Sequence, residues 1–332
     1  MSTGVRWVAD RERAGRGRRG RLGELHGGAG SLVLGAAVLL IVGLVVRGGL
    51  LSERPTLAGP GAGAGALSPT ELTAGAASTL SDALAPGGTG LEFEIVQTST
   101  IVARPGGPLV ELPDPADRTK SLGFAERYPL GTLIERGFAT PDGYWMELLH
   151  GPEPGTEAAF ELATAQVSRQ ALVRDGKLFR NDGEGWHETD ELPGIGLDPA
   201  TIALLPGLLT TATGATEALL DSVIDPATAI PGLRGPESPA VRALAATTTV
   251  ADAPGIIAVD LVAATEITTP AVLAFDAAGR LVGLTITARN TNLEIHDLIV
   301  ETVITFRYPD RPPSLPEPLP AYVAPAPAKD GQ

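Results

Sequence analysis

The side chains best suited to metal or acid–base chemistry are few and scattered in this chain. It has four histidines, His26, His150, His187 and His296, and no cysteine. Zinc is held by Cys, His, Asp or Glu side chains that converge on the ion, and motifs such as H-x-x-x-H place two of them one helical turn apart. None of the histidines has such spacing, and disulfides and thiolate sites are excluded. We expect no metal and no cofactor.

Carboxylates, in contrast, are close together in sequence. The groups are Asp114 and Asp117, Asp182 and Glu184, and Glu188, Asp190 and Glu191. Two carboxylates can hydrolyse a glycosidic bond when they face one cleft, but three tryptophans in the whole chain offer little aromatic surface for a sugar. The twelve-residue calcium pattern, the G-x-S-x-G serine turn and the Walker loop are all missing. An enzyme is therefore the least favoured interpretation, and we expect no catalytic residue.

The charge of the chain argues against nucleic acid as a partner. The 332 residues carry a formal net charge of −14, and their apolar fraction of 43% is enough for a folded core. The charge is uneven: residues 1–47 hold eight arginines and three acidic residues, whereas residues 48–332 hold 17 basic and 36 acidic residues. The N-terminal segment is thus a separate, basic region.

An uncharged apolar segment, residues 27–46, follows this basic region. Twenty helical residues span roughly 30 Å, the thickness of the hydrocarbon layer. Because arginines precede the segment, the positive-inside bias places the N-terminus in the cytoplasm and the bulk of the chain outside. We expect a single-pass protein of the cell membrane with an Arg-rich cytoplasmic tail (1–26) and an extracytoplasmic domain. A cleaved signal peptide, or a twin-arginine signal at Arg18-Arg19, remains the alternative.

Beyond the apolar segment, composition divides the chain into three parts. Residues 47–67 are rich in Gly, Ala and Pro and read as a tether, and residues 309–332 form a Pro-rich tail. Between them, residues 68–308 form the predicted domain. It opens with the capping box Ser68-Pro69-Thr70-Glu71, which predicts a helix with an apolar stripe at Leu72, Ala76, Leu80 and Leu84.

The rest of the domain reads mainly as strands with short turns. Alternating or apolar runs predict strands, some of them joined by turns such as Pro141-Asp142-Gly143 and Asp175-Gly176. The predicted strands are Leu91–Val102, Gly137–His150, Gln166–His187, Ala245–Val250, Gly255–Ala264, Ala271–Asp276, Arg280–Arg289 and His296–Tyr308. A helix that begins at Asp198 and is kinked or broken at Pro206, and a short helix at Glu217–Ile224, separate two groups of strands. This order predicts an antiparallel sheet with one face covered by helices.

In this order of elements the chain resembles the LolA/LppX-like superfamily, which includes the periplasmic lipoprotein carriers and the lipid-binding lipoproteins of the LppX and LprG group. The resemblance covers roughly residues 68–316 and rests on the leading helix and on the segments Leu91–Val102, Leu172–Glu188, Leu204–Ala212, Val272–Ile286 and Ile304–Pro313. No single motif among them is diagnostic.

The resemblance implies an α+β fold class. The expected fold is a strongly curved antiparallel β-sheet, a half-open barrel, covered by helices and here preceded by one transmembrane helix. Proteins of this kind hold acyl chains in the hollow of the sheet and are not enzymes. Two features depart from the family: no cysteine is available for lipidation, and a tethered copy is unable to shuttle between two membranes.

The candidate site is therefore an apolar cavity, and a filled core is the alternative interpretation. Its predicted lining is the inward face of the strands: Phe93, Ile95, Tyr144, Met146, Leu148, Leu284, Ile286, Val300, Ile304 and Phe306. Pro206 and Gly207 are the expected gate, because they would let the central helix flex.

The expected partners of the domain are the acyl chain of a lipid or lipoprotein and the membrane, and an envelope or membrane protein is a further candidate partner. The alternative is a non-catalytic envelope sensor or interaction module that signals through a partner of the cytoplasmic tail.

Overall fold

The structure of the chain is a computed structural model that describes residues 67–113, 120–152, 160–183, 185–189, 199–211, 214–249, 268–291 and 295–317. The predicted cytoplasmic tail, the transmembrane segment, nearly all of the tether and the strand at Gly255–Ala264 lie outside these residues. The chain divides into two compact units. Leu112–Gly123 belongs to the first unit. The described residues of 67–111 and 124–317 belong to the second unit.

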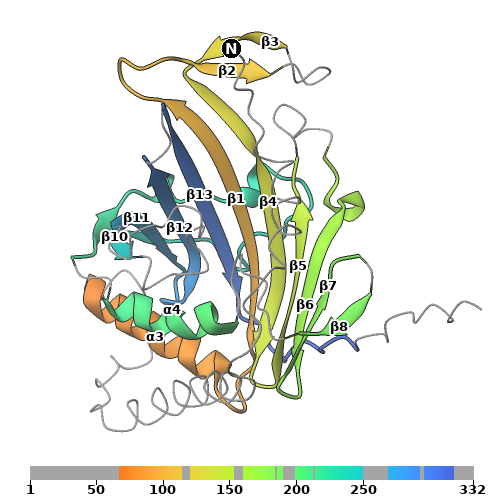
Figure 1. Cartoon of the computed structure of the whole chain (residues 1–332). Coiled ribbons are helices and arrows are strands. Elements are labelled where there is room, and N and C mark those ends of the chain that lie inside the picture. The colour runs from red at the N-terminus through yellow and green to blue at the C-terminus, as the bar shows by residue number, and fades with distance from the viewer. Residues whose placement is uncertain are drawn as a thin grey trace, which may run out of the picture. The chain divides into compact units, whose positions relative to one another are not determined.

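Most of the second unit is one antiparallel sheet (Figure 1). Its strands are β1 (Leu91–Ala103), β4 (Arg127–Thr140), β5 (Gly143–His150), β6 (Val167–Arg174), β7 (Lys177–Asn181), β8 (Trp186–Glu188), β9 (Thr216–Ala218), β10 (Arg242–Thr249), β11 (Thr268–Phe275), β12 (Leu281–Asn290) and β13 (His296–Arg307). Their order across the sheet is β8-β7-β6-β5-β4-β1-β13-β12-β11-β10-β9. Two further strands, β2 (Val110–Pro113) and β3 (Ser121–Ala125), pair as a separate two-stranded sheet and include residues of the first unit.

The central strand β1 separates apolar from charged side chains by simple alternation. Phe93 and Ile95 lie on one face and belong to the main apolar cluster, whereas Glu92 and Glu94 lie on the other. β1 is hydrogen-bonded on both sides, to β13 and to β4, over almost its full length. Most predicted strands are confirmed, as are the turns at Pro141-Asp142-Gly143 and Asp175-Gly176. The part of β4 before Gly137 was not predicted.

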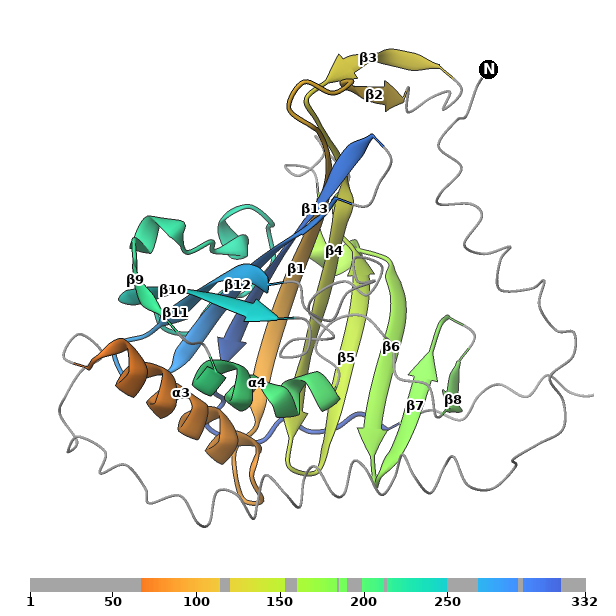
Figure 2. The same cartoon turned by 60° about the vertical axis from the view of Figure 1, so that its left-hand side comes forward.

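Two α-helices, α3 (Pro69–Leu84) and α4 (Pro199–Thr211), pack side by side against the concave side of the sheet (Figure 2). We call this side the inner face. The predicted capping box is present: Ser68 Oγ accepts from the Glu71 N–H at 3.3 Å, and the Glu71 carboxylate accepts from the Ser68 N–H at 2.8 Å. We predicted a kink or a break at Pro206; α4 continues through this residue, so the helix is not broken there.

Three 3₁₀ turns complete the described helical structure: η3 (Leu162–Thr164), η4 (Leu220–Ser222) and η5 (Pro226–Thr228). The helix predicted at Glu217–Ile224 was wrong, because this stretch holds the edge strand β9 followed by η4. β9 pairs with β10 through Ala218 and Ala243, so the segment completes the sheet.

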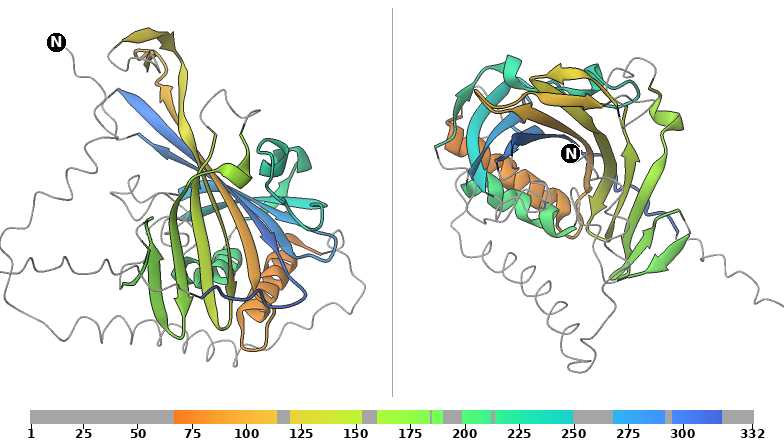
Figure 3. Two further views of the ribbon diagram at one scale, coloured as in Figure 1. Left: turned by 90° about the vertical axis from the view of Figure 1, so that its right-hand side faces the viewer. Right: turned by 45° about the horizontal axis from the view of Figure 1, so that its top comes forward.

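The predicted fold class, a half-open barrel covered by helices and preceded by a transmembrane helix, was wrong. The described chain is mainly one open sheet of eleven strands, with three-residue strands β8 and β9 at its two edges. Helices α3 and α4 have 16 and 13 residues, so they measure roughly 24 and 20 Å, whereas the 14 residues of β4 span roughly 46 Å. Two such helices cover only one end of the inner face (Figure 3).

The predicted single-pass location in the cell membrane is not supported either. None of the helices in the described part of the chain is long and apolar enough to cross a membrane. The predicted span at residues 27–46 lies outside that part of the chain. We therefore do not propose the membrane anchor or the topology that followed from it. Nor do we propose a sensor that signals through the tail.

The opposite, outer face of the sheet is covered by the segment of residues 219–241, which we call the strap. Ile230 and Leu233 of the strap pack with Leu162 of η3 on a second, smaller apolar cluster. The sheet contributes Val96, Ile134 and Leu149 to this cluster, one from each of β1, β4 and β5. The strap thus gives the outer face its own core, separate from that beneath the helices.

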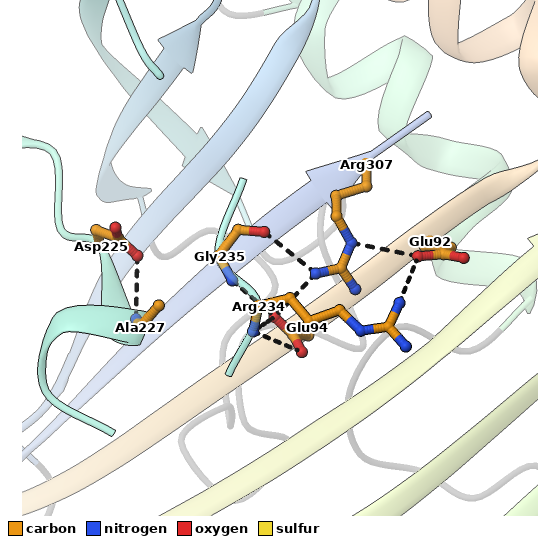
Figure 4. Close-up of polar contacts among 7 residues, drawn as sticks. All are labelled: Glu92, Glu94, Asp225, Ala227, Arg234, Gly235 and Arg307. Atoms are coloured by element: carbon orange, nitrogen blue, oxygen red, sulfur yellow. Dashed lines mark hydrogen bonds and ion pairs between the residues drawn. The ribbon is translucent and has the colours of Figure 1, made fainter. Parts of the chain in front are cut away.

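A buried carboxylate fastens the strap to the sheet (Figure 4). Glu94, 3% exposed, accepts from the backbone N–H groups of Arg234 and Gly235 at 3.0 and 3.2 Å. Arg307 on the neighbouring strand donates to Glu94, to Glu92 and to the Gly235 carbonyl, at 3.2 to 3.3 Å. The carboxylate therefore has charge-assisted bonds to both the sheet and the strap.

Replacement of Glu94 by alanine should destabilise the protein strongly. The change removes the more deeply buried of the two carboxylates that pair with the Arg307 guanidinium, which is 13% exposed, and we expect a loss of about 3 kcal/mol in the free energy of unfolding. Chemical denaturation measures it. Glu301→Ala, on the same face of β13, serves as the control and should cost less than about 0.5 kcal/mol. Equal effects of both variants would contradict this role of Glu94.

A second ion-pair cluster predicts an acid-sensitive contribution to stability. Asp297 accepts from Arg104 Nε at 2.8 Å and from Arg289 Nε at 2.9 Å, and the hydrogen bond from Arg104 does most to hold its pKa below the ordinary value. Because the folded-state pKa is depressed, this contribution is complete above the unfolded-state pKa of about 3.9 and is lost as the pH falls below it.

We therefore expect Asp297→Asn to flatten the dependence of stability on pH in the acid range. Melting curves of both proteins between about pH 7 and pH 3 would test this. Asp142→Asn, a change at an exposed turn residue, is the control and should leave the dependence as it is. A wild-type slope in the Asp297 variant would count against the ion-pair cluster.

Candidate functional site

The structure brings all ten predicted lining residues together on the inner face. Each belongs to the main apolar cluster, and none is more than 7% exposed. They come from β1, β5, β12 and β13, whose alternate side chains point to the same side. Helices α3 and α4 add apolar side chains to this cluster, among them Leu72, Leu80 and Leu205.

The end of the inner face beneath the helices is closely packed. The Phe93 and Tyr144 rings stack at a centroid distance of 6.1 Å. Opposite Phe93 on β4 stands Gly137, where an added Cβ would lie 2.2 Å from the Trp145 carbonyl oxygen and 2.8 Å from Phe93 Cζ. Only glycine fits at this position, so the strands are closely packed here.

Helix α4 lies over this packed region and holds both predicted gate residues. Its apolar side chains, Ile202, Leu205, Leu208 and Leu209, are buried in the main cluster. Pro206 is half-buried and Gly207 is exposed, and a Cβ at Gly207 would meet no atom within 4 Å. Proline lacks the N–H that would bond to the carbonyl one turn earlier, so the middle of α4 is held less firmly than a regular helix.

Farther along the strands a row of polar side chains crosses the inner face. Continuing the alternation of β1, β4, β10, β11 and β13 beyond the apolar residues leads to five polar side chains, Gln97, Glu135, Thr248, Thr269 and Thr302, which we call the polar belt. Four of them are buried, and Gln97 Nε2 donates to Thr302 Oγ1 at 3.2 Å. The inner face is therefore amphiphilic: the polar belt adjoins the apolar residues beneath the helices, and beyond Thr302 on β13 the face is apolar again at Val300 and Leu298.

The polar belt was missed in the sequence. Gln97 follows Phe93 and Ile95 at the same two-residue spacing, which is the signal that could have revealed it. Glu135 lies in the part of β4 before Gly137, which was not predicted. Glycines on either side of it obscure the alternation of polar and apolar residues along the strand. Thr248, Thr269 and Thr302 read as ordinary strand residues.

The other residues singled out for chemistry do not converge in the described part of the chain. His150 and His187 are exposed, and His296 Nε2 lies 3.3 Å from the Leu109 carbonyl. The Ser168 hydroxyl donates to the Leu148 carbonyl within the sheet. No group of three or more His, Asp or Glu side chains capable of holding a metal occurs among the described residues.

Of the carboxylate groups, Asp182 and Glu188 are described and both are ion-paired. Asp182 pairs with Arg180 and Arg169, and Glu188 with Lys177. Partial burial alone would raise the pKa of Asp182, but the bonds from Arg180 and Arg169 outweigh it and lower the pKa. The ion pairs of both carboxylates reinforce the β6–β8 edge.

A shallow pocket of about 280 Å³ lies at the tip of the β6–β7 hairpin. It is lined by Arg174, Asp175, Lys177, Phe179 and Glu317. Its charged groups are of both signs and open to solvent, and Arg174 already lies 3.9 Å from Glu317. The inner face, with its larger apolar area and its buried polar belt, is the stronger candidate for a binding site.

No protein-family model matches the chain, and a search of curated proteins finds no match. The resemblance to the LolA/LppX-like superfamily therefore stays a prediction.

Proposed function

We propose that this protein binds an amphiphile and buries its acyl chain, from a lipid or a lipoprotein, against the inner face of the sheet. The observation that carries the proposal is the amphiphilic inner face, in which the ten apolar residues adjoin the polar belt on the same strands. A ligand with an apolar chain and a polar group matches this combination of apolar and polar side chains.

The energetics favour a chain-shaped ligand. Burial of an acyl chain releases about 0.8 kcal/mol per CH₂, so a modest length of buried chain yields firm binding. The side chains of Ala171, Ala271 and Ala288 on the inner face are small. Binding of this kind needs no catalytic group, and we propose a binding protein rather than an enzyme.

Helix α4 is the part of the cover best suited to move. It is short, it contains Pro206, and its apolar residues rest on the same cluster that a bound chain would contact. An entering chain could replace the contacts of Leu205, Leu208 and Leu209 with its own methylenes. The apolar surface uncovered by the displaced helix would then stay away from water.

Direct binding tests the proposal. The full chain, stripped of lipid by organic extraction and refolded, is offered a monoacylglycerol, and complexes are counted by native mass spectrometry. We expect one molecule per chain. Ala288→Leu, which adds bulk to the inner face, should weaken binding at least about tenfold, and Thr287→Leu, on the opposite face of β12, should not. Melting curves verify that both variants fold.

Absence of any bound monoacylglycerol at concentrations below micelle formation would overturn the proposal. The inner face would then be only a core.

The role of α4 has its own test. Gly207→Ala replaces an exposed helical glycine where the added methyl meets nothing, and it should favour the helix by about 1 kcal/mol. If α4 must move aside before the ligand enters, the association rate constant of the ligand should fall about fivefold, as measured by stopped-flow fluorescence. Gly75→Ala in α3, where a Cβ also meets nothing within 4 Å, is the matched control. Equal rates in both variants would argue against α4 as the gate.

A further inference from the structure

Three strands of the sheet, β1, β4 and β13, extend beyond their neighbours at the end away from the helices (Figure 2). β5 pairs with β4 only from Leu133 to Thr140, so the preceding residues of β4 have no partner strand on that side among the described residues. β12 pairs with β13 only as far as Leu298, whereas β1 continues to Ala103 opposite His296. We call residues 101–111, 124–131 and 295–298 the tip.

The tip exposes large apolar side chains. Each of them is 47–66% exposed, and they are Leu109, Phe124, Leu130 and Ile295. Printed contacts bring their segments together: the Leu109 carbonyl lies 3.3 Å from His296 Nε2, and the Ala103 N–H donates to the Glu126 carbonyl at 2.8 Å. Exposed apolar side chains that gather at one end of a protein indicate an interaction site.

The exposed apolar area of the tip is small for a protein partner. Half of four side chains of this size amounts to roughly 400 Å², whereas a specific protein interface takes about 800 Å² from each partner. A lipid surface sets no such minimum, because each apolar side chain that enters it leaves water without any need for shape complementarity. Lipid is therefore the better-matched occupant.

The charges of the tip also favour a lipid surface. Arg104 and Arg289 of β12 share Asp297, at 2.8 and 2.9 Å, and Arg127 adds a third positive charge. With Glu111 and Glu126 included, the tip is close to electrically balanced, whereas residues 48–332 as a whole hold 36 acidic and 17 basic residues. Phosphate groups at a lipid surface repel an acidic protein, so the tip is a part of the domain that can approach them.

A second set of exposed apolar side chains lies beside the edge strand β9. It comprises Leu219, Leu220, Ile224 and Val241. Asp221 and Asp225 stand among these residues in sequence, and Asp221 is exposed. The acidic side chains make this patch a poorer match for phosphate groups than the tip, and it serves as the comparison below.

The inner face leads from the tip to the proposed ligand site. Ile101 and Leu298 are paired across β1 and β13, and they continue the alternation of inner-face side chains that runs through Val300 to the polar belt. Leu298 packs against the main apolar cluster. An acyl chain that leaves a lipid surface at the tip therefore meets apolar side chains along these strands.

We propose that the tip docks on a lipid surface and that the amphiphile enters the protein from there. This inference rests on the proposed function and names the source of its ligand. The contact requires only that apolar side chains of the tip enter the head-group layer.

The test reads the position of single side chains on vesicles. The chain has no cysteine, so Phe124→Cys, Ile295→Cys and Leu219→Cys each give the full chain one thiol for a fluorescent label. Leu219, which is 78% exposed, is the matched control. Vesicles of phosphatidylcholine that contain a nitroxide-labelled phosphatidylcholine quench a label in the head-group layer. We expect quenching at positions 124 and 295 to exceed that at 219 by at least about threefold.

Equal quenching at all three positions, or stronger quenching at 219, would overturn the tip as the docking surface. Weak quenching at all three would overturn a lipid surface as its occupant and favour a protein partner. Each label reports its own position, so the result does not depend on how other parts of the chain associate with the vesicle. Melting curves verify that the labelled variants fold, and two tip positions keep the test decisive if one variant does not.

The proposed function is tested separately, by titration of the unlabelled chain with monoacylglycerol in the absence of vesicles. Binding of monoacylglycerol without quenching at the tip would overturn the docking surface alone. Absence of monoacylglycerol binding would overturn the proposed function, and with it the entry of an amphiphile from the tip.

Discussion

The register of β1 between β13 and β4 is the constraint on which the rest of the structure depends. β1 pairs with β13 from Glu92↔Arg307 to Ala103↔His296, and this pairing sends Phe93 and Ile95 inward and Glu92 and Glu94 outward. A slip of one residue would exchange the two sets and place carboxylates beneath the helices. Both cores, the ion pairs of the strap and the order of the inner face all follow from this one alignment.

The sheet carries covers of two different kinds on its two faces. On the outer face the strap is held by Glu94 through directional, charge-assisted bonds to backbone N–H groups. On the inner face, α4 rests on the sheet through apolar side chains such as Leu205 and Leu208. Apolar contacts are non-directional and can be exchanged for those of another apolar molecule, whereas a buried charge network is lost if it is broken. This contrast is the physical reason to assign binding to the inner face.

Sequence patterns predicted those elements whose signal is local. The capping box at Ser68, the β6–β7 hairpin around Asp175-Gly176 and the alternation of β1 each depend on residues a few positions apart. The start of β4 was missed because Pro129 and Gly131 interrupt it, and pairing with β1 decides its conformation. The helix predicted at Glu217–Ile224 failed for the same reason, since β9 forms only where β10 provides a partner.

The candidate site shows the same division. Its ten apolar residues could be predicted because hydrophobic side chains at alternate positions of a strand indicate a shared face. That Gln97, Glu135 and Thr302 lie near one another could not, since it depends on which strands are neighbours and in which register. The membrane location was inferred from composition in a region that the described structure does not include, and none of the described helices supports it.

The pairing of β1 with β13 also bears on how the protein is made. Gln97 and Thr302, which meet across these strands, are 205 residues apart in the chain. At a synthesis rate of about 5–20 residues per second, β1 waits roughly 10 to 40 s on the ribosome before β13 emerges to pair with it. During that time one edge of the central strand, including the apolar side chains of its inner face, is unprotected. Such a delay exposes a nascent chain to misassociation, so chaperone demand should be concentrated in the interval before the last strand is synthesised.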